Sequence, residues 1–149
     1  MEIAWSRNRV IVAASGNDGR NGYVSHPASF PNVIAVGSIG STSSRSYFSN
    51  GGPQLDLMAP GESVISTVPT TSIMCGVRLD PYCSVSGTSM ATPHVAGVAA
   101  LVFSLCPSWT NAQVVNRLFN TADDLGSAGW DQSYGWGRVD AYDAVRLGC

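Results

Sequence analysis

Ser89 stands at the start of a predicted helix, where a serine can act as a nucleophile. It follows Gly87 and Thr88, and a mostly apolar run from Val95 to Phe103 comes after it. The first turn of a helix carries free backbone N–H groups and a partial positive charge. A hydroxyl there can attack an acyl carbon while its own backbone N–H binds the oxyanion. Serine is also a common helix N-cap, so position alone leaves simple capping open.

The eleven residues 87–97, Gly-Thr-Ser-Met-Ala-Thr-Pro-His-Val-Ala-Gly, resemble the nucleophile motif of the subtilisin-like serine peptidases, the subtilases. The resemblance implies a serine endopeptidase of the peptidase S8 family, which cleaves polypeptides through an acyl-enzyme on Ser89. It continues in family order through residues 4–6, 30–37, 57–61 and 134–141. An esterase of the α/β-hydrolase type fits poorly, because its Gly-x-Ser-x-Gly elbow is absent around Ser89.

The Gly-rich turn Ser-Gly-Asn-Asp-Gly at residues 15–19 resembles the oxyanion-hole segment of the same family. This implies that Asn17 supplies the side-chain donor to the oxyanion, whereas the residue type alone would also suit an ordinary turn. The resemblance places Asp18 at the rim of the substrate pocket, where it either favours basic side chains modestly or is a solvated turn carboxylate. The pocket itself would be formed by Ala14, Ser15, Gly16 and Gly22.

A general base is the part that the sequence does not offer. His94 lies five residues after Ser89 on one predicted helix, ~140° around its axis and ~7.5 Å along it, so the two side chains diverge. We expect His94 to be a structural core histidine. His26 lies in a loop that the family places near the substrate pocket. The family's His-Gly-Thr segment and its Asp-Ser-Gly or Asp-Thr-Gly segment are both absent.

The subtilisin triad runs Asp, His, Ser along the chain, so an N-terminal truncation would remove the first two and keep Ser89. We therefore expect residues 1–149 to be a partial subtilase catalytic domain, roughly its C-terminal half. Such a chain would be inactive alone and would need the missing N-terminal half as a partner. The alternative is a non-catalytic remnant or peptide-binding module that lacks the base.

Charge and hydropathy exclude several other kinds of partner. The net charge is −2 with 12% charged residues, which gives no basic footprint for nucleic acid. We find no apolar run of roughly 18 residues that would cross a membrane, and no signal peptide at the start. Few charges and four cysteines are nevertheless typical of secreted proteins, so we expect the parent protein to be extracellular.

Four cysteines allow three disulfide pairings. We prefer Cys75 with Cys83, enclosing a loop just before the nucleophile motif, and Cys106 with Cys149, joining the end of the apolar helix to the C-terminus. Free buried thiols are the alternative.

No cofactor is needed for the chemistry, and no Cys/His metal spacing is present. The family resemblance implies a weak structural cation site for calcium or sodium, built from the backbone carbonyls of Ala28, Phe30 and Val33. Three carbonyls without a carboxylate make a weak site for a hard cation.

The elements that must position these residues alternate between strands and helices. Apolar runs predict strands at 10–14, 33–37, 55–59 and 64–67, with a turn at Pro60-Gly61. The all-apolar helix that Ser89 opens should be buried on every side and end before Pro107. A capping box at residues 110–113 begins a second helix that turns Val114, Val115, Leu118 and Phe119 inward, and Asp140 with Asp143 begins a last one carrying Ala144 and Leu147.

This order predicts an α/β protein with a mainly parallel sheet, the incomplete three-layer fold that the subtilase resemblance implies. Sites in such sheets lie at the carboxyl ends of strands, so Asn17 and Ser89 should meet there. We also expect an open sheet edge at Val10 to Ala14, with an apolar face left uncovered.

Overall fold

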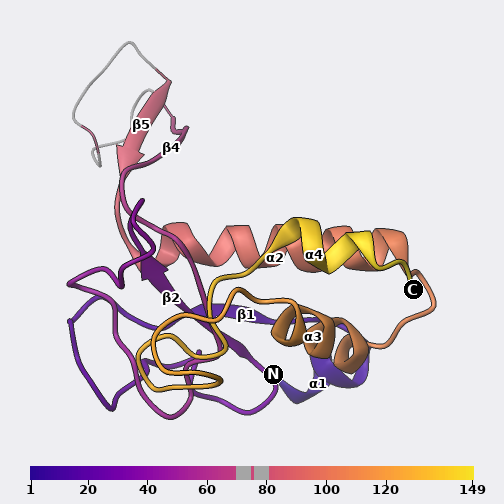
Figure 1. The fold of residues 1–149 in the computed structure, drawn as a ribbon. Helices are drawn as coiled ribbons and strands as arrows, with labels where there is room; N and C mark the ends of the chain where they lie inside the picture. Colours follow the sequence, from indigo (N-terminus) through magenta and orange to yellow (C-terminus); the bar gives the residue numbers. More distant parts are fainter. Residues whose placement is uncertain (70–74, 76–80) are drawn as a thin grey trace.

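The computed structural model describes residues 1–69, 75 and 81–149. Most of the loop between Cys75 and Cys83 lies outside the described residues. The elements in chain order (Figure 1) are α1 (Glu2–Ser6), β1 (Val12–Ala14), β2 (Ile34–Ile39), β3 (Leu57–Pro60), β4 (Val64–Thr67), β5 (Tyr82–Val85), α2 (Thr88–Leu105), α3 (Asn111–Asn120) and α4 (Ala141–Arg146).

Strands β1, β2 and β3 form a parallel sheet in that spatial order, which confirms the predicted sheet type. The boundaries differ from the prediction. The first strand begins at Val12 rather than Val10, and the second continues to Ile39 because all six of its residues are buried. The third begins at Leu57, two residues later than predicted.

Strand β1 is an edge strand, paired with β2 on one side only among the described strands. The carbonyl of Ile11 and the N–H of Ser15 both bond to β2. Alternate residues of a parallel strand face the same neighbour, so Val12 and Ala14 turn their backbone N–H and C=O groups to the other side. No described strand lies there, and the predicted open edge is confirmed for this part of the chain.

Helix α2 crosses one face of the sheet and, with α3 and α4, encloses the larger core cluster. Its inner side contributes Ala91, Val95, Val98, Ala99 and Val102 to that cluster. The prediction that this helix is buried on every side is wrong. Leu101 is 52% exposed and Ala96, Gly97 and Ala100 are exposed, because no described element covers the outer side.

The length and apolar composition of α2 would also suit a membrane span, alone among the helices of the described residues. This corrects the expectation that no segment reaches that length. Its inner side packs on the sheet, and a core helix satisfies the same criterion.

The opposite face of the sheet carries a second core cluster that loops cover in this part of the chain. Ala13, Ala35 and Met58 of the strands pack there against Val24 and Leu55 from the connecting segments.

Strands β4 and β5 form an antiparallel ribbon that projects from the rest of the molecule (Figure 1). Strand β5 was not predicted, because its sequence contains no continuous apolar run. Its partner β4 is also separated from it by more than ten residues, so no short hairpin turn indicates the pairing. The side chain of Ile65 on β4 is 71% exposed.

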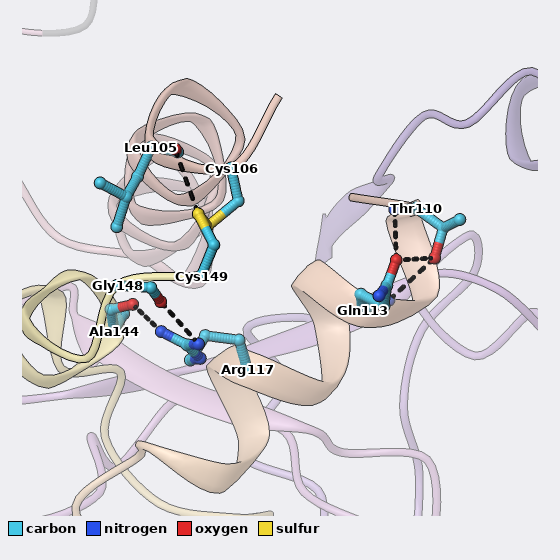
Figure 2. Close-up of a disulfide and its surroundings, with 8 residues drawn as sticks. All are labelled: Leu105, Cys106, Thr110, Gln113, Arg117, Ala144, Gly148 and Cys149. Carbon is cyan, nitrogen blue, oxygen red and sulfur yellow. Dashed lines mark hydrogen bonds between the residues drawn. A yellow bond between two sulfur atoms is a disulfide. The ribbon is translucent and has the colours of Figure 1, made fainter. Parts of the chain in front are cut away.

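Helix α3 begins as predicted, with a capping box at Thr110. The Thr110 hydroxyl accepts the Gln113 backbone N–H, and the Gln113 side chain accepts the Thr110 N–H (Figure 2). Asn111 joins this start to the N-terminal segment, since its Nδ2 donates to the Trp5 carbonyl at 2.8 Å.

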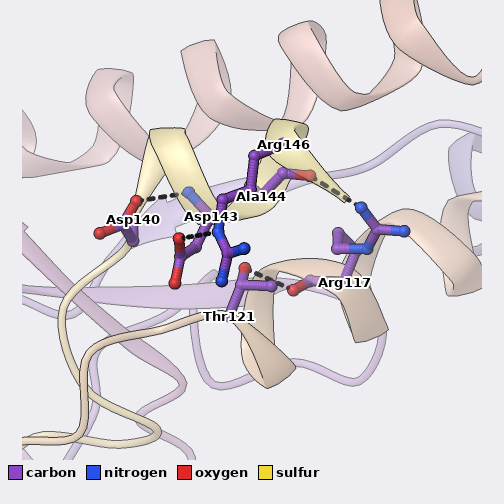
Figure 3. Close-up of polar contacts among 6 residues, drawn as sticks. All are labelled: Arg117, Thr121, Asp140, Asp143, Ala144 and Arg146. Atoms are coloured by element: carbon purple, nitrogen blue, oxygen red, sulfur yellow. Dashed lines mark hydrogen bonds and ion pairs between the residues drawn. The ribbon is translucent and has the colours of Figure 1, made fainter. Parts of the chain in front are cut away.

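Asp140 caps the start of helix α4, as predicted, and its carboxylate accepts the Asp143 N–H (Figure 3). Its Ala144 is buried, whereas Leu147 is 59% exposed. Arg117 of α3 donates to the carbonyls of Ala144 and Gly148, so α3 holds the C-terminal segment in place.

Both preferred disulfides are present, Cys75–Cys83 and Cys106–Cys149. Figure 2 shows the second joining the end of α2 to the C-terminal residue.

We expect that Cys106→Ser with Cys149→Ser lowers the free energy of unfolding by about 4 kcal/mol, because the bond closes a loop spanning 43 positions. Urea denaturation measures the loss. The matched pair Cys75→Ser with Cys83→Ser, spanning 8 positions, should cost about 2.5 kcal/mol. Equal losses of stability in the two double variants, or a larger loss for Cys75→Ser with Cys83→Ser, would contradict this explanation.

Candidate active site

Ser89 lies in the first turn of α2 with its side chain exposed. Gly87 precedes the helix, and its N–H donates to the Gly61 carbonyl at 2.8 Å. A Cβ on Gly61 would lie 2.7 Å from the Gly87 oxygen and 2.4 Å from the Ser38 hydroxyl, so only glycine allows this approach. The end of the β3 segment thus fixes the start of the helix that carries Ser89.

Asn17 is joined directly to the residue before Ser89. Its Oδ1 accepts the Thr88 backbone N–H at 2.8 Å and the Thr88 hydroxyl at 2.8 Å. The Thr88 hydroxyl in turn accepts the Gly16 N–H at 3.3 Å. These bonds bring residues 71 positions apart to one place, as predicted for the carboxyl end of the sheet.

The two bonds also decide which end of the Asn17 amide is available. With Oδ1 occupied by Thr88, the Nδ2 group is left as a donor next to the start of α2. Thr88 was missed by sequence reasoning, although it lies inside the recognised motif, because its partner is far away in the chain. Its side chain is fully buried at 0% exposure.

Among the residues assigned to the substrate pocket, Ala14 ends β1, and Ser15 and Gly16 directly follow it. Ser15 is buried and its hydroxyl donates to the Asn50 carbonyl at 3.0 Å, while Ala14 and Gly16 are half-buried. Gly22 is exposed. The Asp18 carboxylate accepts a hydrogen bond from Asn50 Nδ2 at 3.1 Å, so it is a structured turn carboxylate at the surface rather than a purely solvated one.

Neither histidine is placed as a base for Ser89. His94 is exposed, so the expected core position is wrong, and its Nδ1 donates to the Met90 carbonyl at 3.0 Å. His26 shares a 2.6 Å hydrogen bond with Ser29 and stacks on Phe30, with ring centroids 4.4 Å apart.

Two cavities flank the predicted nucleophile and oxyanion donor. One of about 350 Å³ lies beside Ser89, between the β4 strand and the first turns of α2, and is lined by Val64, Ile65, Ser66, Ser89, Met90, Pro93 and His94. The other, of about 340 Å³, lies beside Asn17 and is lined by Asn17, Tyr47, Phe48, Glu62, Ser63 and Ser86. The site is thus open on both sides of the Ser89–Asn17 pair.

The three residues of the candidate cation site share one cavity of about 290 Å³ with a carboxylate. Ala28, Phe30 and Val33 line it together with Asp56, which the sequence argument did not include. Asp56 Oδ2 accepts the Ala35 N–H at 2.8 Å. Burial raises the pKa of the Asp56 carboxyl to about 6, and the bond from Ala35 acts in the opposite direction. Backbone carbonyls and a half-buried carboxylate are the kinds of oxygen ligand that a hard cation prefers.

The chain is similar to subtilisins in sequence and to subtilisin-like proteases in structure. It is 45% identical over 149 residues to a subtilisin of Bacillus pumilus, covering 98% of this chain and 50% of the relative. It is 48% identical over 143 residues to subtilisin Savinase of Lederbergia lenta, covering 96% and 48%. The crystal structure of a lanthipeptide protease matches with a TM-score of 0.88 at 28% identity, covering 98% and 53% of the two chains.

The structure of the prenylagaramide maturation protease PagA matches with a TM-score of 0.82 at 30% identity, covering 99% and 54%. The predicted subtilisin-like α/β fold is confirmed by these likenesses, and the chain spans about half the length of these four proteins. The model of the subtilase family, Peptidase S8, matches residues 2–137. The chain belongs to the subtilase family.

Proposed function

We propose that residues 1–149 are the nucleophile-bearing part of the catalytic domain of an extracellular serine endopeptidase. The observation that carries this proposal is the pair of bonds from Thr88 to Asn17 Oδ1, which leaves the Asn17 amide as a donor beside Ser89. Peptide hydrolysis is the reaction that such an arrangement serves in this family. The two disulfides support an oxidising, extracellular setting.

In the proposed reaction, Ser89 Oγ attacks the carbonyl carbon of a peptide bond and its proton passes to a base. The oxyanion accepts hydrogen bonds from Asn17 Nδ2 and from the Ser89 backbone N–H. The base then protonates the departing amine and an ester to Ser89 remains. Water, deprotonated by the same base, attacks the ester carbonyl carbon, the bond to Ser89 Oγ breaks, and the base returns the proton to Ser89 Oγ. The side chain before the scissile bond would lie against Ala14, Ser15, Gly16 and Gly22, with Asp18 at the rim.

In this proposal the base comes from a polypeptide outside these residues, because no side chain among the described residues forms a hydrogen bond to the Ser89 hydroxyl. The 350 Å³ cavity beside Ser89 has room for an imidazole. The second candidate function, a non-catalytic remnant or peptide-binding module, is favoured by the same lack of a base. The two differ in whether completion of the domain activates Ser89.

The surface that would receive the completing polypeptide lies between β1 and α2. A groove of about 540 Å³ there joins the open edge of β1 to the exposed side of α2, and its walls are mainly apolar. The occupant that we propose is the remaining half of a subtilase domain, which would pair a strand with Val12 and Ala14 and cover the exposed alanines. The groove is lined by Asn8, Arg9, Val10, Val12, Ala96, Ala99, Ala100, Phe103 and Pro107.

A fluorophosphonate probe tests the proposed function, because it modifies only an activated serine. We expect little labelling of the 149-residue chain alone. Labelling at Ser89 should rise at least tenfold when the chain is co-refolded with the part of Bacillus pumilus subtilisin that it does not match; we name this complex the completed chain. No rise on completion would favour the remnant, and strong labelling of the chain alone would contradict the need for an outside base.

A charged side chain introduced into the groove tests whether the completing polypeptide binds there. Ala100 is exposed in this chain and would be covered in the complex, so Ala100→Glu should leave the unaided chain unchanged and reduce the labelling of the completed chain. Asn116→Glu, at an exposed position of α3 outside the groove, should not reduce it. Equal effects of the two variants would contradict the proposed surface.

We further propose that Asp56 and the carbonyls of Ala28, Phe30 and Val33 hold a calcium or sodium ion. At a Kd of about 1 mM, calcium at 10 mM would stabilise the protein by about 1.4 kcal/mol. Calorimetry at pH 8 should show a higher melting temperature with calcium than with magnesium at equal ionic strength. Asp56→Asn should remove the difference, and persistence of the difference in that variant would contradict the site.

A further inference from the structure

The loop that carries Asn17 is held by a buried side chain from a distant segment. Asn50 is fully buried at 0% exposure. Its Oδ1 accepts the backbone N–H groups of Asp18 at 3.1 Å and Arg20 at 2.9 Å. Its Nδ2 donates to Asp18 Oδ2 at 3.1 Å and to the Ser25 hydroxyl at 3.3 Å. Both ends of the amide are therefore used on residues 15–25.

The backbone of Asn50 is tied to the same loop. Its N–H donates to the Gly16 carbonyl at 2.9 Å, and its carbonyl accepts the Ser15 hydroxyl at 3.0 Å. Asn50 thus binds the residue on each side of Asn17, Gly16 before it and Asp18 after it. The backbone position of Asn17 is fixed by these neighbours, while Thr88 fixes its side-chain amide.

The space around Asn50 admits little adjustment. Gly16 has a φ of +109°, and a Cβ there would lie 2.4 Å from Asn50 Nδ2. The position also requires both an acceptor and a donor, because Oδ1 faces two N–H groups while Nδ2 faces a carboxylate. Aspartate would supply the acceptor but place a second carboxylate against Asp18.

We propose that Asn50 is a positioning residue for the oxyanion donor: it holds the loop 15–20 so that Asn17 Nδ2 meets the oxyanion formed at Ser89. Asn50 itself does not touch the substrate and acts through Asn17. The role rests on the proposed function, and it assigns to Asn50 an effect on the transition state rather than on substrate binding.

The first test measures kcat and KM of the completed chain on a peptide substrate in two backgrounds. With Asn17 present, Asn50→Ala should lower kcat by about 10- to 100-fold with little change in KM. In the Asn17→Ala background the same substitution should change kcat less than about twofold, because the donor that Asn50 positions is already absent. Equal losses in the two backgrounds would overturn the proposal in favour of a merely structural role.

Exchanging the amide and the carboxylate between positions 50 and 18 tests whether activity lost in one variant is restored by the second substitution. Asn50→Asp should lower kcat because it sets two carboxylates against each other. Adding Asp18→Asn should restore much of the activity, since the new amide can donate to the new carboxylate. The control is Ser46→Ala, a buried serine on the same segment whose hydroxyl bonds to Ser38 at 2.7 Å and not to the loop. Failure of the rescue, or a loss in the control as large as in Asn50→Ala, would overturn the proposal.

Amide hydrogen exchange on the 149-residue chain tests the same role without any activity. Asn50→Ala should speed exchange of the Asp18 and Arg20 amides by about tenfold. The Met58 amide, bonded to the Gly137 carbonyl at 2.8 Å, should be unaffected. Unchanged exchange at Asp18 and Arg20 would overturn the positioning role, and so would an equal rise at Met58. An inactive completed chain would instead refute the proposed function and leave the exchange result to decide on Asn50.

Discussion

Replacing Ser89 with alanine should abolish peptide hydrolysis by the completed chain, with kcat reduced by about a million-fold. This is the size of the loss known for the nucleophile of subtilisin itself and is adopted from it. The physical reason is that Ser89 is the exposed hydroxyl proposed to attack the peptide, at the start of α2 beside the Asn17 amide. Cleavage of a fluorogenic peptide measures the effect.

The control for this variant is Ser133→Ala, which removes an exposed hydroxyl in a loop that lines neither cavity of the site. The Ser133 backbone N–H donates to Asp131 Oδ1 at 2.7 Å, a bond that the substitution keeps, so this variant should keep both its fold and its activity. Circular dichroism and the melting temperature should show both variants folded. Residual hydrolysis by Ser89→Ala at the level of the unsubstituted completed chain would refute the assignment of the nucleophile.

Replacing Asn17 with alanine should lower kcat by about 10²- to 10³-fold while KM changes little. The range is the one known for the equivalent donor of subtilisin, which is the standard example of this effect. The donor acts on a charge that exists only in the transition state, so ground-state binding is spared. Steady-state kinetics on a peptide substrate separates the two parameters.

Two further variants serve as controls for Asn17→Ala. Asn17→Asp keeps an oxygen for the Thr88 bonds and loses the donor, so it should be nearly as slow as Asn17→Ala. Asn116→Ala removes an exposed asparagine of α3 that lies outside the groove and away from the site, and it should leave kcat unchanged. A rise in KM at constant kcat for Asn17→Ala would assign this residue to substrate binding instead.

Short-range patterns in the sequence predicted the parts of the structure that depend on neighbouring residues. The capping box at Thr110 and the cap at Asp140 occur as predicted, since both are decided within four residues. The motif at 87–97 likewise located the helix start and its serine. In each case the relevant partners are close in sequence.

Contacts over longer distances were not predictable in this way. Asp56 lines one cavity with Ala28, Phe30 and Val33, which lie more than 20 positions earlier, and nothing in its own segment predicts this. Asn50 reaches a loop about 30 positions before it, and its sequence neighbours give no hint of burial. The role of each of these two side chains depends on contact between segments that are distant in the sequence. Hydrophobic periodicity within one segment does not predict such a contact.

Helix α2 shows why an apolar composition does not fix burial. Its residues have no polar face, which predicts burial on all sides. The described sheet and helices cover one side only, and the small residues Ala96, Gly97 and Ala100 remain exposed. Composition reports what the helix can pack against, whereas exposure depends on which elements are there.

The bonds between Thr88 and Asn17 Oδ1 set the order in which an active site would assemble. In the proposed site, Ser89 and Asn17 are already held together through Thr88, so an incoming half would have to deliver only the base and its orienting carboxylate. The entropic cost of aligning Ser89 with Asn17 is therefore incurred when this chain folds and not when the two halves associate. If the proposed function holds, an incoming half would affect activity mainly through how well it positions one imidazole beside Ser89, so the corresponding halves of other subtilases should also complete the site.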